Sequence, residues 1–247
     1  MSSFDELGFL SDQVEEARLV IREQLPAEFA QVEAAVRLSI AELATVQGCV
    51  SPGYLVAMGY WLRCIESCQG AVLLIERGLP GAPYPVLRTA FECLFFACAV
   101  WRKPVLLDKL KAGHDAERIK QANLMLAAGA AARVTPERLS DLQAIAAEPN
   151  DGIGVSAWEA ANAADLVFEY QTAYRGFGIA GAHATARSLD DYVEQLEDGS
   201  FTLGLEPGCE GAAWLLGLVV TCLSCGTARH REARSQELAS DAGAQGG

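Results

Sequence analysis

The segment PVLRTAFECLFFACAVW, residues 85–101, decides the fold of this chain. Apolar side chains would cover every side of a helix with this sequence, which indicates a helix at the centre of the molecule. Its only charged residues, Arg88 and Glu92, lie four positions apart and therefore on one face. An unpaired charge in a dry environment is costly, so both side chains should have partners. The sequence predicts a buried polar centre that contains Arg88 and Glu92.

A long helix is expected immediately before this segment. Ser51 followed by Pro52 is typical of a helix start, because the hydroxyl caps the helix and proline fits its first turn. Apolar residues then recur with helical spacing until Gly78, a typical helix end. The connection GLPGAPYP, residues 78–85, contains three prolines and cannot continue a helix. The two helices should therefore pack antiparallel as a central hairpin.

Helical periodicity extends over most of the remaining sequence, without convincing strand alternation or an internal repeat. Further helices are expected over about residues 4–24, 29–47, 115–132, 135–148, 157–174 and 211–231. The sequence predicts an all-α fold, a single-domain irregular helical bundle around the central hairpin. The domain should cover residues 1–234, with its core in about 50–230, and residues 235–247 should form a disordered tail.

Composition restricts the function classes. Hydrophobic residues make up 51% of the chain, and the formal net charge is -13. Such acidity argues against a general DNA or nucleic-acid binder, although RNA could still bind a locally basic patch. The first residues lack the basic start and apolar run of a signal peptide, so a cytoplasmic location is expected. A protein or an RNA is the expected partner, and a homo-oligomer is compatible with the sequence.

The uncharged segment from residue 211 to residue 228 allows two interpretations. Its length is close to the lower limit for crossing a bilayer. Its second half contains Thr221, Ser224 and Thr227, which favours a core helix over membrane contact. Contact with a membrane therefore remains the less favoured alternative.

Arg88 and Glu92 themselves allow a functional and a structural interpretation. They could form an anion-binding or proton-handling centre in which Glu92 holds Arg88. They could equally form a structural ion pair that fixes helix packing, with partners such as Arg63, Glu66 or Glu76 on the preceding helix. Arginine before glutamate is the weaker order for a pair within one helix, which favours partners on another helix.

A second group of polar residues contains Tyr174, Arg175 and His183. Histidine is the side chain whose ordinary pKa lies near neutrality, so His183 is the best acid–base candidate. Arg175 could stabilise a phosphate or a developing negative charge, and Tyr174 could contact the substrate. His114 is expected at an exposed helix start, and His230 suits the end of the last helix.

The cysteines are most simply explained as small buried apolar residues. Cys222 and Cys225 have the spacing of metal ligands, and Cys64 and Cys68, one helical turn apart, could supply a second pair. No Glu-x-x-His motif supports a helical di-iron site, and no Gly-x-Ser-x-Gly motif supports a hydrolase triad. The sequence therefore predicts no metal and no cofactor.

The stretch 71–101 resembles a widespread group of uncharacterised, all-helical prokaryotic proteins. Their signature is a helix that ends in glycine, a short turn, and a helix with Leu-Arg-x-x-x-Glu. The matching positions here are Gly78, Leu87, Arg88 and Glu92.

The same group contains a later Tyr-Arg…His element, which is similar to Tyr174, Arg175 and His183. The resemblance covers about residues 50–230. It implies a single helical domain in which these three residues converge with the two charged residues of segment 85–101. The group has no settled activity, so the resemblance suggests a site and no reaction.

Some of these proteins resemble HEPN-type helical ribonucleases of toxin–antitoxin and phage-defence systems. The arginine and histidine of that family lie closer together in sequence than Arg175 and His183, which seven residues separate. Arg229 and His230 are adjacent and do not match the spacing either.

Three functions remain open. The first is a bacterial stress- or defence-associated effector in which His183 is the acid–base group, Arg175 and Arg88 hold phosphate, and Glu92 orients Arg88. The second is a non-catalytic interaction module whose polar centre is structural. The third is a membrane-associated helical protein that uses residues 211–228.

Overall fold

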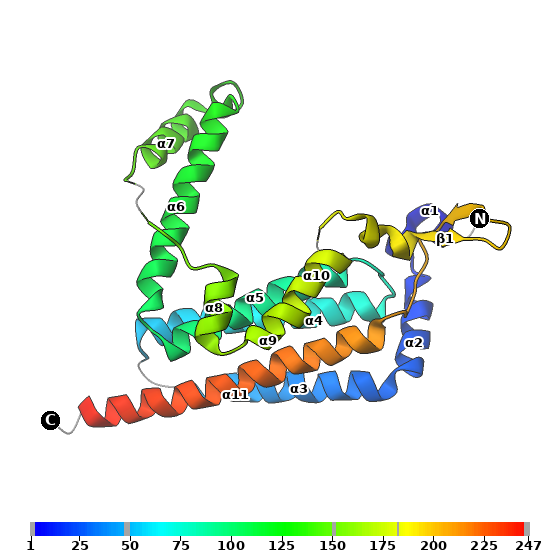
Figure 1. Ribbon diagram of the computed structural model, residues 1–247, viewed down its shortest axis with the longest axis horizontal. Coiled ribbons are helices and arrows are strands. Elements are labelled where there is room, and N and C mark those ends of the chain that lie inside the picture. The colour runs from blue at the N-terminus through cyan, green and yellow to red at the C-terminus, as the bar shows by residue number, and fades with distance from the viewer. Residues whose placement is uncertain (1–2, 47–49, 150–151, 182, 245–247) are drawn as a thin grey trace.

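The computed structural model describes residues 3–46, 50–149, 152–181 and 183–244, and its architecture is all-α (Figure 1). Gly48, Cys49, Asn150 and Asp151, which the sequence placed at a helix end and in a loop, lie outside these residues. The elements are α1 (Ser3–Leu7), η1 (Gly8–Leu10), α2 (Val14–Gln24), α3 (Pro26–Ala44), α4 (Pro52–Glu76), α5 (Pro83–Arg102), α6 (Leu106–Ala127), η2 (Ala130–Ala132), α7 (Pro136–Ala146), α8 (Ala157–Ala164), α9 (Val167–Glu169), η3 (Tyr170–Tyr174), α10 (Arg175–Ala180), η4 (Ala186–Tyr192), β1 (Val193–Gln195), β2 (Phe201–Leu203) and α11 (Ala212–Ala244).

The predicted central hairpin of α4 and α5 is confirmed. Ser51 caps α4 by accepting a hydrogen bond from the backbone N–H of Tyr54 at 3.3 Å. Gly78 has a φ of +75°, the left-handed conformation that suits a residue just after a helix. Most residues of α5 are buried, as the apolar character of its sequence predicted. The hairpin is therefore the centre around which the other helices pack.

The long helix α11 lies beside α3 and closes the bundle over α4 and α5 (Figure 1). Gly226 is the point of closest approach, since a Cβ atom at this position would lie 2.0 Å from Cζ3 of Trp61. Nearby, the hydroxyl groups of Ser39 and Thr227 are 2.8 Å apart in a buried hydrogen bond. A glycine and two small polar residues thus let α11 pack tightly against the hairpin and α3.

A second layer and an arm complete the molecule. The segment from α8 to α10 covers one side of α5, while α6 and α7 project away from the bundle as a helical arm (Figure 1). The arm begins where two backbones nearly touch, because a Cβ atom on Gly113 would lie 2.4 Å from Cα of Gly154. This contact holds the returning chain against α6 before the chain enters α8.

Three elements differ from the sequence-based expectation. A short antiparallel hairpin pairs Val193 with Leu203, whereas no strand was expected. Its strands have only three residues each, too few to show alternation. The helix expected over 157–174 is divided at Asp165, which has a φ of +60°. The part of the expected tail that the structure describes, up to Ala244, continues α11 as a helix, and Glu237 accepts a hydrogen bond from the backbone N–H of Ser51.

Two helices are long and apolar enough to cross a membrane by length and composition alone, Pro83–Arg102 and Ala212–Ala239. This is weak evidence, because the core helix of a bundle passes the same test. The first of these helices is packed on several sides by other helices of the molecule.

Candidate functional site

Arg88, Glu92 and Tyr174 form one group of contacts, the polar cluster. Nη1 of Arg88 donates a hydrogen bond to the backbone carbonyl of Tyr174 at 2.9 Å. The guanidinium carbon of Arg88 lies 3.8 Å from the centre of the Tyr174 ring, in a cation–π contact. The hydroxyl group of Tyr174 donates to Oε2 of Glu92 at 3.1 Å. Tyr174 thus contacts both charged residues of α5.

Glu92 holding Arg88 was one of two interpretations, and the order of the two residues favoured partners on another helix. The described hydrogen bond of Glu92 is with Tyr174, on another element. The cluster was also expected in a dry interior, whereas Arg88 and Glu92 are half-buried at the side of the bundle. Glu76, one of the partners considered for them, instead forms an ion pair with Arg22 at 2.7 Å.

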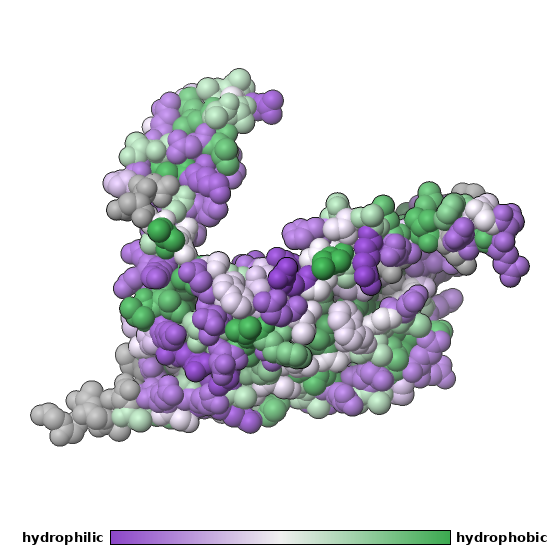
Figure 2. Space-filling view, in the orientation of Figure 1, coloured by the Kyte–Doolittle hydropathy of each residue, from purple (hydrophilic) through white to green (hydrophobic). Residues whose placement is uncertain are grey.

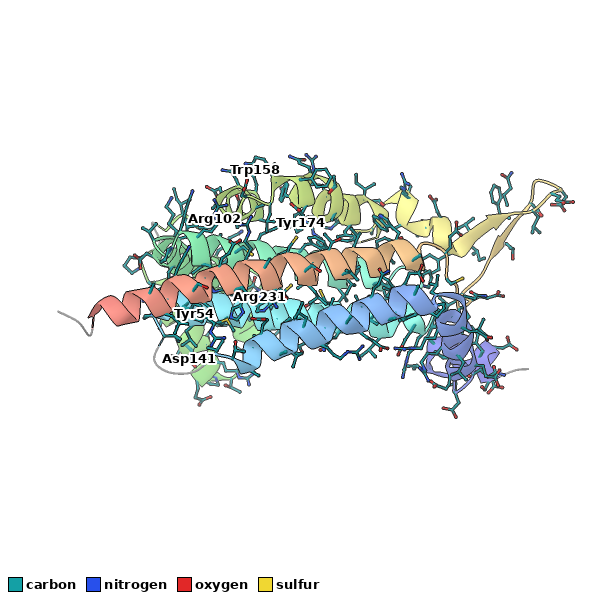
Figure 3. The ribbon with its side chains drawn as sticks, turned by 90° about the horizontal axis from the view of Figure 1, so that it is seen from below. Tyr54, Arg102, Asp141, Trp158, Tyr174 and Arg231 are labelled. Atoms are coloured by element: carbon teal, nitrogen blue, oxygen red, sulfur yellow. The ribbon has the colours of Figure 1, made fainter. Side chains whose placement is uncertain are left out.

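A π-helical turn, η3, places Tyr174 over α5. Such turns often occur at functional positions, because the extra residue changes where the following side chains point. Tyr170 stacks on Tyr174 with ring centres 5.1 Å apart, and Phe95 of α5 contacts Tyr174 edge-on at 5.7 Å. In Figure 3, Tyr174 and Trp158 lie in the layer of α8 to α10, away from Tyr54 and Arg231. These aromatic contacts fix the ring on which Arg88 rests.

The electrostatic environment keeps the Tyr174 phenol neutral. Burial and, next, the negative charge of Glu92 raise the pKa of Tyr174 to about 12, although Arg88 acts in the opposite direction. The phenol therefore retains its proton at neutral pH and remains a hydrogen-bond donor to Glu92.

His183 lies at the edge of the polar cluster, just after α10. The side chain is exposed. Gly178, which has no side chain, leaves space beside both His183 and Arg88. A Cβ atom on Gly178 would lie 3.1 Å from Nη1 of Arg88 and 3.5 Å from Cδ2 of His183. A side chain at this position would crowd Arg88 and touch the His183 ring, so both groups border the space beside Gly178.

Arg175 takes a different position. Its Nη1 donates to Oε1 of Gln171 at 3.3 Å, along the exposed surface of the helix. Among the described residues, no hydrogen bond or ion pair joins Arg175 to Arg88, Glu92 or His183. The polar cluster thus joins three of the five residues that the sequence suggested, while His183 lies near Arg88 beside Gly178 and Arg175 lies apart.

Arg88 retains capacity to bind an anion. Within the described part of the chain, no carboxylate forms an ion pair with its guanidinium group. One of its five N–H groups reaches the carbonyl of Tyr174, and the ring of Tyr174 covers one face.

A cleft of about 1150 Å³ opens beside Glu92, between the arm and the bundle. Figure 2 shows the hollow between the projecting arm and the body of the molecule. Polar residues from several elements line the cleft, among them Glu92, His114, Lys120 and Ser156. No pattern in the sequence indicated that His114 and Lys120 would line the same cleft as Glu92, because only the orientation of the arm brings them there.

Cys64, Cys68 and Cys222 form a separate cluster, the thiol cluster, between α4 and α11. Their sulfur atoms all lie within 4.8 Å of one another, and the three side chains are fully buried. Burial raises the pKa of Cys64 and of Cys222, whereas hydrogen bonds from these two thiols lower the pKa of Cys68. Soft metal ions prefer ligands of this kind. Cys225, the fourth cysteine that the sequence suggested, is not part of the cluster.

The buried histidine of this protein is His230, which the sequence placed at the end of the last helix, where the helix dipole would favour it. It is 0% exposed, and its Nε2 lies 2.8 Å from the Tyr54 hydroxyl. Burial lowers the pKa of His230. His230 does not end the helix, because α11 continues to Ala244. The apolar residues before it in α11 were the available signal for its burial.

Comparisons with known proteins give one match. A family model described as "Family of unknown function (DUF5677)" matches residues 54–201, which include α5, the arm and the polar cluster. No curated protein and no solved structure matches the chain.

Proposed function

The chain belongs to the DUF5677 family of unknown function, and from this premise we propose that it is a stress- or defence-associated effector that binds a phosphate-bearing ligand, with RNA as the candidate. We place this activity in the cytoplasm. Arg88 carries the proposal: it is a half-buried guanidinium group, fixed by Tyr174, that has no described carboxylate partner. The planar donor geometry of arginine matches the oxygen atoms of phosphate groups.

The proposed roles follow from the contacts. Arg88 binds a phosphate oxygen, and His183 acts as the acid–base group beside it. Glu92 positions Tyr174, and Tyr174 positions Arg88, so Glu92 acts indirectly on the phosphate site. Arg175 would add a second positive charge only if its side chain turned away from Gln171. In this proposal the protein itself supplies the groups that move protons and hold the phosphate.

The first experiment is induced expression in a bacterial host, with growth, total RNA integrity and soluble protein measured together. Wild type is compared with His183→Ala, Arg88→Met and Arg175→Ala. Arg138→Ala, an exposed arginine on the arm, is the matched control. We expect wild type and the Arg138 variant to slow growth and degrade RNA, and the first two variants to remain soluble without these effects.

Other outcomes distinguish the alternative functions. No growth or RNA effect of the wild type would contradict the effector proposal, and an interaction module with a structural polar cluster would then be the better explanation. Recovery of wild type in the membrane fraction after cell disruption would favour the membrane-associated alternative through residues 211–228.

Ligand binding can be tested without relying on toxicity. The purified full-length chain is titrated with inorganic phosphate and with a short single-stranded RNA. Arg88→Met should weaken binding of both probes at least about tenfold, because an arginine–phosphate contact contributes roughly 1.5–3 kcal/mol. Equal binding by wild type and Arg88→Met would overturn the assignment of Arg88.

A further inference from the structure

The thiol cluster is the second place in the molecule where reactive groups converge. Cys64 and Cys68 lie on successive turns of α4, so both sulfur atoms face α11. Cys222 of α11 meets them there, with 3.5 Å between its sulfur and that of Cys64. Three thiols from two helices, far apart in sequence, thus meet at one point.

The spacing of the sulfur atoms suits a metal ion. A metal ion about 2.3 Å from each of three sulfur atoms in one plane places those atoms about 4 Å apart. The thiol cluster has one sulfur separation of 3.5 Å and all separations within 4.8 Å. Small rotations of the side chains would therefore bring the three sulfur atoms around one ion without moving the helices.

The number of ligands distinguishes between metals. Zinc in proteins takes four ligands in a tetrahedron. Among the described residues, the cluster contains three sulfur atoms and neither a histidine nor a carboxylate. The three side chains are 0% exposed, so water does not readily supply a fourth ligand. A soft ion that accepts two or three sulfur ligands fits better, and thiolates select monovalent copper.

We propose that Cys64, Cys68 and Cys222 form a buried site for one monovalent copper ion. Each thiol that coordinates the ion releases its proton as the copper–sulfur bond forms, so binding strengthens as the pH rises. Because the site is enclosed, the ion enters while the chain folds.

The test is reconstitution of the full-length chain. The protein is unfolded under anaerobic, reducing conditions and refolded with copper(I) supplied from a coloured copper(I) chelator. Copper per chain is measured after desalting, and X-ray absorption counts the sulfur ligands. We expect one tightly held copper ion with only sulfur neighbours. A parallel refolding with zinc should leave no retained metal.

Variants locate the ion. Cys222→Ala and Cys68→Ala should lower the copper affinity at least about tenfold, in keeping with loss of a ligand. Cys98→Ala is the matched control, since Cys98 is an equally buried cysteine of α5 outside the cluster, and it should retain copper. Circular dichroism verifies that each variant folds.

Several results would overturn the copper site. They are wild type without retained copper, copper retained equally by Cys222→Ala, and retention of zinc in preference to copper. A Cys64–Cys222 disulfide in the protein isolated under reducing conditions would also contradict it, because that bond would remove two of the three ligands. If both cluster variants fail to fold, nitrogen or oxygen neighbours of copper in wild type would decide against the site.

Discussion

Tyr174 is the residue that makes the polar cluster one unit. Its carbonyl and ring hold Arg88, and its hydroxyl group binds Glu92, although the two charged residues lie on the same helix. The sequence predicted correctly that Arg88 and Glu92 share a face. It could not predict that a tyrosine from a distant π-helical turn would lie between them, because that contact depends on how η3 packs on α5.

Tyr174→Phe should separate the contact of the ring with Arg88 from the hydrogen bond of the hydroxyl group to Glu92. The ring under Arg88 is kept, but the half-buried carboxylate of Glu92 loses its donor, so the free energy of unfolding should fall by about 1–2 kcal/mol. Urea denaturation measures this change. Tyr170→Phe, which alters the neighbouring stacked ring, is the control and should change stability by less than about 0.5 kcal/mol. Equal losses in both variants would show that the Glu92 contact contributes nothing.

His230 should make the fold sensitive to acid. Burial lowers its pKa below the ordinary value of 6.5, so His230 binds a proton less readily in the folded chain than in the unfolded chain. Stability from this group is therefore present above about pH 6.5 and is lost as the pH falls through the lowered pKa. Unfolding measured across this range should show the loss, and His230→Gln should flatten it. His114→Gln, at an exposed histidine, should leave the pH profile unchanged.

At the scale of elements, local signals predicted the central hairpin well. The Ser51 cap, Gly78 and the prolines of the connection act through neighbours in sequence, and they were sufficient to place α4 and α5. The break at Asp165 and the extension of α11 past Ser235 were not predictable in this way. Asp165 ends α8 in the left-handed conformation, which residues other than glycine seldom adopt. The end of α11 is held by a contact between Glu237 and Ser51, which is distant in sequence.

The contact between α4 and α11 depends on Gly226. In Gly226→Ala, the new methyl group would meet the ring of Trp61, so we expect a loss of about 1–3 kcal/mol in unfolding free energy. Gly217→Ala on the same helix meets nothing within 4 Å and should be neutral or stabilise by up to about 1 kcal/mol. Thermal or urea unfolding compares the two. A Gly226 variant as stable as the Gly217 variant would contradict the close packing.

At the scale of the whole molecule, a well-packed bundle carries an arm with few buried side chains. α7, which is described throughout, buries none of its residues, and α6 buries only Ile119 and Ala122. Sequence periodicity suggested ordinary bundle helices here. Their weak amphipathic pattern indicates that α6 and α7 are helices, but it does not indicate how they are oriented relative to the bundle. The cleft beside Glu92 therefore could not be predicted.

Backbone amides of the arm should exchange with solvent hydrogen much faster than those of α4, α5 and α11. Helices that bury few side chains open locally at small cost in free energy. Hydrogen exchange followed by mass spectrometry tests this, with peptides of α5 as the internal reference. Protection of α7 as strong as that of α5 would show that the arm is held by contacts in solution.

The near-touching backbones of Gly113 and Gly154 have a consequence for how this family can vary. This close contact joins the two chain ends of the arm at the point where the arm meets the bundle. Residues 114–149 should therefore tolerate lengthening, shortening or replacement while this contact keeps both chain ends together. A reporter domain can be inserted in the turn between α6 and α7, at the end of the arm that lies away from the bundle (Figure 1).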